Sequence, residues 1–363
     1  MTEQRDIIST RGLQFEFNRH GGNITNLVIE TEDGQSVRPL HAAPWTQTPS
    51  DLPDDVDLVE RQLAGDFFCA PFGASEGGPI HGQTANGNWQ PQPAAQGKAD
   101  TVRYTLQQTV QGAKVEKSFT LVEGHPFLYQ NHTFSGGQLD LPIAHHAMIH
   151  VPGGAQLSFS KKQFGITPTA PLETDPARGQ CSLLYPQRFE DITKTALADG
   201  GISDASQYPF SQGHEDILIL AEDKAATTGW SAALAEKDGF LFFAIKDARV
   251  LPETLLWMSN GGRYYPPWSG RHTAVLGIEE AATACHDRGD FGSSPKISQH
   301  GLKCGLTLQQ DADKEIRYGF GAIPVPEGWS KIDDIDVESN RLTLMDISGE
   351  SLTLPFLGSH FGL

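Results

Sequence analysis

Alternation of apolar and polar residues is the feature that most constrains how this chain can fold. Leu13-Gln14-Phe15-Glu16-Phe17 places apolar side chains on one face of an extended segment and polar side chains on the other. The same pattern predicts strands at residues 103–110, 114–122, 127–134, 142–150, 216–221, 240–246, 255–258, 274–279 and 315–320. Glycine and proline, 38 and 23 of the 363 residues, interrupt these segments with frequent turns, which excludes a helical bundle.

Helical signals are scarce. The sequence suggests one short helix at Pro186 to Ala198, and strands do not alternate with long helices, which excludes a parallel α/β sheet. The chain contains no internal repeat and no clear linker. We therefore expect a single all-β domain over residues 1–363, a large antiparallel β-sandwich with long loops around 35–100 and 160–213.

The charge of the chain limits its partners. It has 45 acidic and 27 basic residues, a net charge of -18, which disfavours binding to nucleic acids and to anionic membrane surfaces. No apolar run approaches the ~18 residues that span a bilayer, and the first residues lack a signal-peptide pattern. The four cysteines are far apart, so reduced thiols in a cytoplasmic protein are expected: Cys69, Cys181, Cys285 and Cys304.

Two groups of histidines could carry chemistry. His81 lies among turn residues in Gly78-Pro79-Ile80-His81-Gly82, where an isolated histidine usually has only a structural role. His145, His146 and His150 lie on one predicted strand. Residues four apart on a strand are separated by roughly 13 Å, too far for two ligands of one ion. A metal site is therefore not expected there.

Two further segments combine carboxylates with apolar strands. Glu215 and Asp216 precede an apolar run, and alternation allows only one of them to face a pocket. Residues 255–280 interleave aromatic side chains with Arg263 and end in carboxylates. Aromatic rings pack on the C–H faces of sugars while polar groups bind the hydroxyls, so this segment suits carbohydrate. A packed aromatic edge of the core would give the same pattern, and both interpretations stay open.

Taken in order, these segments resemble the aldose 1-epimerase (galactose mutarotase-like) family. Residues 146–153 are similar to the family's H-S-Y-F-N-L-x-G strand, His81-Gly82 to its H-G loop, and Gly277-Ile278-Glu279 to its late x-L-E strand end. The resemblance covers most of residues 11–320 and is that of a divergent bacterial-type member. It implies an antiparallel supersandwich with no metal or organic cofactor, and interconversion of the α and β anomers of a free aldose.

The resemblance also implies roles for particular residues. Glu279 would be the general base and His146 the general acid, on opposite sides of the sugar. The expected substrate-binding residues are His81, Glu215 or Asp216, Trp257, Arg263 and Asn86. The family's substrate-binding arginine has no clear match, and Arg61, Arg263 and Arg271 are the candidates to replace it.

Two classes of function remain open at this point. The first is an aldose 1-epimerase-like enzyme, and the alternative is a non-catalytic carbohydrate-binding β-sandwich. A sandwich domain of a polysaccharide-active enzyme is disfavoured because no helical catalytic domain accompanies it. The partner in the first two cases is a small-molecule aldose, neutral rather than phosphorylated given the net charge of -18. A monomer and a homodimer are both compatible with the sequence.

Overall fold

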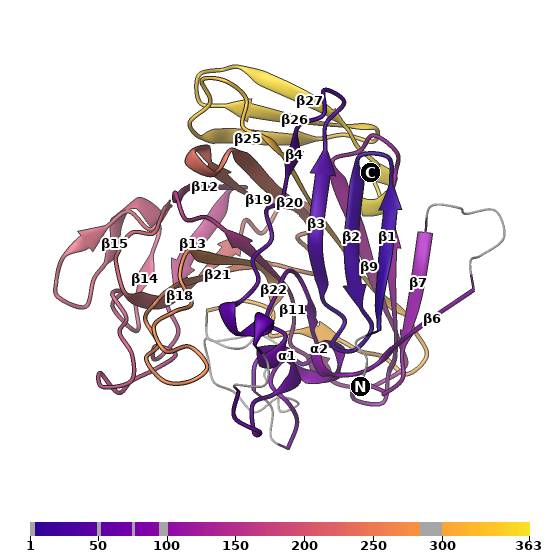
Figure 1. Cartoon of the computed structure of the whole chain (residues 1–363), viewed down its shortest axis with the longest axis horizontal. Helices are drawn as coiled ribbons and strands as arrows, with labels where there is room; N and C mark the ends of the chain where they lie inside the picture. The colour runs from indigo at the N-terminus through magenta and orange to yellow at the C-terminus, as the bar shows by residue number, and fades with distance from the viewer. Residues whose placement is uncertain (1–3, 49–51, 75–76, 94–100, 284–299) are drawn as a thin grey trace.

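A computed structural model describes residues 4–48, 52–74, 77–93, 101–283 and 300–363 (Figure 1). Cys285, one of the cysteines expected to be reduced, lies outside these ranges. The predicted all-β class is confirmed, because strands dominate the described residues and neighbouring strands in the sheets run antiparallel.

Two large sheets form the sandwich. The larger has nine strands in the spatial order β17 (Gln207–Tyr208), β12 (Ala155–Phe159), β19 (Thr228–Ala235), β20 (Phe240–Asp247), β24 (Lys314–Pro324), β9 (Phe127–Ser135), β8 (Lys114–Thr120), β7 (Thr101–Leu106) and β6 (Trp89–Pro91). The smaller has seven, in the order β14 (Arg188–Phe189), β13 (Lys162–Ile166), β18 (His214–Glu222), β21 (Glu253–Asn260), β22 (Val275–Ala282), β11 (Ile143–His150) and β5 (Phe68–Cys69). Apolar residues of both sheets share one core between them.

The seven-stranded sheet is buried on both faces. Every residue of β22 is buried, because alternate side chains enter two different apolar clusters. Leu276 and Ile278 belong to the core between the sheets, whereas Val275 and Ala281 belong to a cluster on the outer face. A strand covered on both sides tolerates apolar residues at every position. Loops rather than a third large sheet cover the outer face, which leaves room there for a cavity.

Smaller sheets pack around the two large ones (Figure 1). A four-stranded sheet comprises β1 (Arg5–Thr10), β2 (Leu13–Asn18), β3 (Ile24–Glu30) and β4 (Ser36–Val37), and Phe15 and Phe17 pack against Phe119 of β8. A C-terminal sheet of β25 (Ile332–Val337), β26 (Arg341–Asp346) and β27 (Ser351–Pro355) covers the nine-stranded sheet through a third apolar cluster. Two short pairs join β10 (Asp140–Leu141) to β23 (Leu306–Thr307) and β15 (Thr195–Ala196) to β16 (Ile202–Ser203).

The helix predicted at Pro186 to Ala198 was wrong. The segment instead contains β14, the 3-10 turn η3 (Ile192–Lys194) and β15. Asp191 accepts a hydrogen bond from the backbone N–H of Thr193, which stabilises a single turn, and the following residues pair with β16.

The first long loop contains short elements: η1 (Pro44–Gln47), α1 (Leu58–Arg61) and α2 (Gly82–Asn86). These short helices matter because α1 and α2 lie beside the outer face of the seven-stranded sheet (Figure 1). Among the residues that the structure describes, no helix combines the length and apolar character needed to cross a bilayer.

Candidate active site

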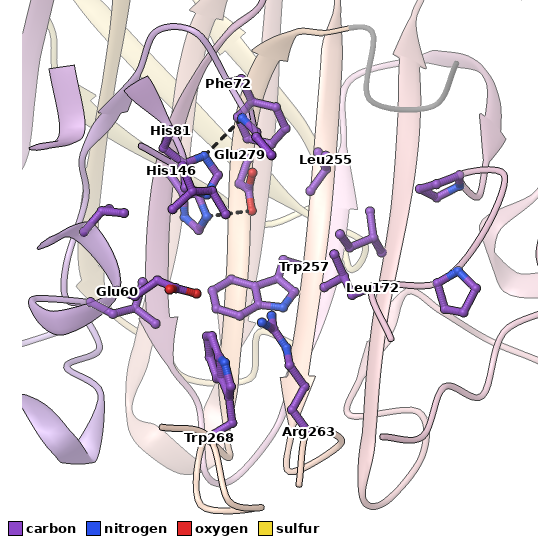
Figure 2. A pocket seen from close by; sticks show the side chains of 18 of the residues that line it. Glu60, Phe72, His81, His146, Leu172, Leu255, Trp257, Arg263, Trp268 and Glu279 are labelled. Atoms are coloured by element: carbon purple, nitrogen blue, oxygen red, sulfur yellow. Dashed lines mark hydrogen bonds and ion pairs between the residues drawn. The ribbon is translucent and has the colours of Figure 1, made fainter. Parts of the chain in front are cut away.

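A cavity of about 320 Å³ opens on the outer face of the seven-stranded sheet (Figure 2). Residues from 59–81, 168–172 and 263–268 line it together with side chains of the strands. This volume is near the lower end of the range for small-molecule sites, about 300–1,000 Å³. Most of the lining is apolar and includes the indoles of Trp257 and Trp268. Five polar side chains also reach the cavity: Glu60, His81, His146, Arg263 and Glu279.

Glu279 and His146 form the polar centre of the cavity. The register of β22 with β11 pairs these two residues directly across neighbouring strands. The Nε2 atom of His146 lies 3.2 Å from Oε1 of Glu279, and both side chains are buried. The expectation that they lie on opposite sides of a sugar was wrong, because residues paired directly across adjacent strands are side by side. Phe67 stacks on the His146 ring at a centroid distance of 4.5 Å and limits its rotation.

Burial controls the charge of this pair. It raises the pKa of Glu279 well above the usual range of a glutamate. Burial also lowers the pKa of His146 well below that of a free histidine, and the nearby His81 adds to the lowering. Both shifts favour the uncharged forms. Because the two groups are in contact, they titrate as a coupled pair that holds one proton between them.

His81 lies beside this pair and owes its position to an unusual backbone. Its φ of 63° is in the left-handed region, and it directly precedes α2. Gly82 follows at a φ of +69°, where a Cβ would lie 2.1 Å from the carbonyl oxygen of Ala70. The His81 ring is perpendicular to that of His146 at 5.3 Å between centroids. The backbone N–H of Gly73 donates to Nδ1 of His81, so the neutral ring carries its proton on Nε2. Burial lowers the pKa of His81 to about 4.

Glu215 lies behind the cavity wall and organises two residues that form it. Its carboxylate accepts hydrogen bonds from the Trp257 indole, from Ser259 Oγ at 2.7 Å, and from Nε and Nη2 of Arg263 at 2.9 and 2.7 Å. The guanidinium of Arg263 lies 3.7 Å from the centre of the Trp268 ring. Trp257 and Arg263 therefore line the cavity as expected, while Glu215 positions them without reaching it.

Two further residues expected to bind substrate, Asp216 and Asn86, do not line the cavity either. Asp216 faces the interior between the sheets, where its carboxylate accepts hydrogen bonds from the backbone N–H groups of Ser182 and Leu183. It lies on the opposite face from Glu215 because successive residues of a strand point to opposite sides. Asn86 is used within the loop: it accepts from the N–H of Val59 and donates to two carbonyls. Its polar atoms are thus occupied in joining α1 to α2.

The cavity also contains residues that the sequence did not point out. Glu60 on α1 comes from a stretch of loop without any strand pattern, so its spacing carried no signal. Trp268 belongs to the aromatic segment at residues 255–280, and this membership was the only indication in the sequence that it lines the cavity. Among the three candidate arginines, Arg263 lines the cavity, whereas Arg61 donates to the carbonyls of Val56 and Pro53. Arg271 donates to the carbonyl of Pro267.

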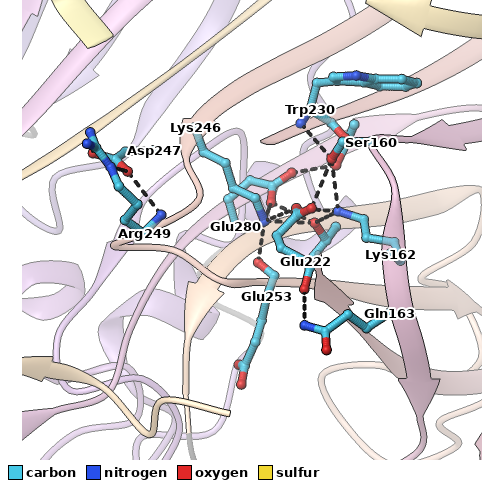
Figure 3. Close-up of polar contacts among 12 residues, drawn as sticks. Ser160, Lys162, Gln163, Glu222, Trp230, Lys246, Asp247, Arg249, Glu253 and Glu280 are labelled. Carbon is cyan, nitrogen blue, oxygen red and sulfur yellow. Dashed lines mark hydrogen bonds and ion pairs between the residues drawn. The ribbon is translucent and has the colours of Figure 1, made fainter. Parts of the chain in front are cut away.

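The inner face of the same strands carries a buried ionic network (Figure 3). Glu280, the neighbour of Glu279, contacts Nζ of Lys246, which also lies 2.9 Å from Oε1 of Glu222. Lys246 belongs to β20 and the two glutamates to β22 and β18, so the network joins the two large sheets. Lys162 contacts Glu222 from β13. These four side chains are almost fully buried, and each charge has an opposite partner.

No metal site was expected from the sequence. Within the described ranges, no group of three or more His, Cys, Asp or Glu side chains is arranged to hold an ion.

Comparisons with known proteins place the fold. No protein-family model and no curated protein matches this chain. Among solved structures, a galactose mutarotase related enzyme from Lactobacillus acidophilus has a TM-score of 0.54 at 11% identity, covering 89% of this chain and 99% of its own. The Slr1438 protein from Synechocystis sp. PCC 6803 has a TM-score of 0.56 at 9% identity, covering 90% and 97%.

A GalM/aldose epimerase homologue from C. elegans has a TM-score of 0.52 at 14% identity, covering 90% of this chain and 100% of its own. The chain therefore has the galactose mutarotase-like fold, as a divergent representative. Likeness at such low identity defines the architecture, and the chemistry has to be argued from the cavity itself.

Proposed function

We propose that this protein is an aldose 1-epimerase that interconverts the α and β anomers of a free, neutral aldose by acid–base ring opening and closing. The observation that carries the proposal is the buried contact between Glu279 and His146 at a sugar-sized cavity. The galactose mutarotase-like fold and the aromatic wall formed by Trp257 and Trp268 support it.

Ring opening needs two proton transfers at one carbon. The anomeric hydroxyl loses its proton, the ring oxygen gains one, and the bond between C1 and the ring oxygen breaks to give an aldehyde. Because both oxygens are attached to C1, two catalytic groups in contact can serve them. Glu279 takes the proton from the anomeric hydroxyl and His146 delivers one to the ring oxygen, each transfer contributing roughly 10²–10⁴ in rate.

The pair keeps one proton in total throughout this cycle. Ring opening starts from the carboxylate and the imidazolium, and ends with the neutral carboxyl and the neutral imidazole. Hydrogen bonds from the sugar to the carboxylate favour the ionised form. The neutral form, which burial favours, stabilises the open-chain intermediate. In ring closure the carboxyl of Glu279 returns its proton to the aldehyde oxygen, and His146 takes the proton of the hydroxyl that attacks C1. Rotation about the C1–C2 bond before closure gives the other anomer.

His81 supports these steps as a hydrogen-bond donor. Its Nε2–H is the donor left after Gly73 occupies Nδ1. The low pKa of His81, about 4, keeps the ring uncharged near neutral pH. It can therefore bind either oxygen at C1 without competing with His146 as an acid.

Optical rotation tests the proposal directly. Freshly dissolved α-D-glucose, α-D-galactose and α-D-xylose are followed with and without protein, and we expect the approach to equilibrium to accelerate for at least one of them. Failure to accelerate any common aldose would defeat the enzymatic proposal. Retained sugar binding in that case would leave the alternative, a non-catalytic carbohydrate-binding sandwich. The variants Glu279→Gln and His146→Ala separate the two functions, because binding should largely survive while turnover is lost.

A further inference from the structure

Glu60 is the one acidic side chain at the cavity, apart from Glu279, in the described part of the chain. It lies on the short helix α1, and its backbone carbonyl is anchored by the indole N–H of Trp45 at 2.7 Å. Figure 2 shows its carboxylate pointing into the cavity beside Trp257 and Trp268, below the Glu279 and His146 pair. Burial raises the pKa of Glu60, and this effect exceeds the lowering by the nearby charge of Arg263.

The carboxylate of Glu60 has no direct partner within the described ranges, and only the more distant charge of Arg263 acts on it. Its carboxylate has no hydrogen bond there and no cation within 4 Å, whereas other charged groups at the cavity are matched. Arg263 is held by Glu215 through two of its nitrogens. Glu279 is matched by His146. The cavity therefore presents one unmatched negative charge, at the end away from the catalytic pair.

We propose that Glu60 is the specificity-determining residue of this site. It accepts hydrogen bonds from sugar hydroxyls remote from C1, and its charge restricts the substrate to aldoses without an acidic group. Uronates and sugar phosphates therefore bind more weakly than the corresponding neutral sugars. This inference rests on the proposed function, because the sugar must present C1 to Glu279 for its far end to reach Glu60.

Two physical effects support this assignment. A half-buried carboxylate requires donors, and the hydroxyls of a sugar supply them where the apolar wall does not. Hydrogen bonds to a charged group are the strong ones, so losing this contact should weaken binding of a neutral hexose about 10- to 100-fold. The acidic group of a uronate would be repelled by the carboxylate of Glu60. At a separation of about 8 Å and an effective dielectric constant of about 20, this repulsion weakens binding of the uronate about 30-fold.

Matched pairs of sugars test the proposal. D-galactose and D-galacturonate differ only at C6, as do D-glucose and D-glucuronate, and their binding is measured by NMR titration at low salt. The wild-type protein should bind at least one neutral hexose about 30-fold more tightly than its uronate. Glu60→Gln should weaken binding of the neutral hexose and bring the ratio near 1. Asp55→Asn, which removes the same charge from an exposed position of the same loop, should change neither value.

The outcomes separate this inference from the proposed function. Binding that depends on Glu60 without any mutarotation would defeat the enzymatic proposal and leave the recognition role standing. Mutarotation with an unchanged ratio in Glu60→Gln would overturn the inference alone. Failure of the wild type to bind any of the four sugars would also overturn it. A loss of affinity in Glu60→Gln with the ratio kept would show a structural role and likewise refute it.

Discussion

Replacing Glu279 by glutamine separates the proposed catalytic role of this residue from its effect on stability. The variant keeps the size and shape of a side chain that is 2% exposed and lies 3.2 Å from Nε2 of His146. It removes the group that we propose accepts the proton of the anomeric hydroxyl. Because a general base contributes roughly 10²–10⁴ in rate, we expect turnover of the best aldose to fall by that factor. The affinity for the sugar should change much less.

The stability of the same variant should move in the opposite direction. The pKa of Glu279 is raised by burial above the unfolded value near 4.5, so the folded state binds the extra proton at intermediate pH. The contribution of this group to stability is present below pH 4.5 and is lost as the pH rises toward the folded pKa. The loss reaches at most about 1.4 kcal/mol per pH unit. Glu279→Gln removes this loss, so the variant should be more stable than the wild type at pH 7 and similar to it near pH 4.

Urea unfolding at several pH values and optical rotation on the same samples measure both effects. Glu236→Gln, at an exposed turn position, serves as the control for a lost glutamate charge. Full turnover in Glu279→Gln would refute the catalytic role. A variant less stable than the wild type at pH 7 would refute the argument that burial opposes the ionised carboxylate.

Three further variants test other parts of the structure. The pKa of His81 is lowered to about 4, so its contribution to stability is lost as the pH falls from about 6.5 toward 4. In His81→Gln the melting temperature should therefore fall less over this pH range than in the wild type. Lys246→Met leaves the buried carboxylate of Glu280 without a cation, while Glu222 keeps Lys162. The variant should cost about 3–5 kcal/mol in urea unfolding, a result that an unchanged midpoint would contradict. Asp216→Asn should lower the free energy of unfolding by about 1–3 kcal/mol, because it weakens the hydrogen bonds to the backbone of Ser182 and Leu183. The affinity for the sugar, measured by NMR titration, should stay unchanged. A reduced affinity would place Asp216 at the cavity after all.

Much of the fold was predictable because strand patterns are local. The alternation in Leu13 to Phe17 lies within β2, and the predicted strand at 142–150 corresponds to β11. Alternation also predicted that only one of Glu215 and Asp216 could face a pocket, and the structure puts Glu215 toward the outer face. The helix expected at 186–198 failed because a capped turn and two short strands use the same residues.

Residues that line the cavity could be predicted from the sequence where they lie on a strand or in a tight turn. Those that lie on a loop could not. Glu279 and His146 lie on strands whose register brings them together, and the left-handed backbone of His81 needs the glycine that follows it. Glu60 and Asn86 are both loop residues, and their neighbours decide their roles. Asn86 satisfies backbone groups nearby, while the carboxylate of Glu60 is left facing the cavity. No spacing of residues in the sequence distinguishes the role of Glu60 from that of Asn86.

Consecutive residues on the strands of the smaller sheet perform different tasks, and this arrangement explains why a few charged side chains lie inside an otherwise apolar sandwich. Glu279 faces the cavity while Glu280 binds Lys246 between the sheets. A slip of one residue in β22 would exchange the two, placing Glu280 at the cavity and separating Lys246 from its partner. The buried ion pair therefore opposes that slip, because the slipped strand would leave the charge of Lys246 without Glu280. In the same way, the backbone contacts of Asp216 keep Glu215 on the outer face beside Arg263. Interior polar contacts thus specify which carboxylate each strand presents to the outer face.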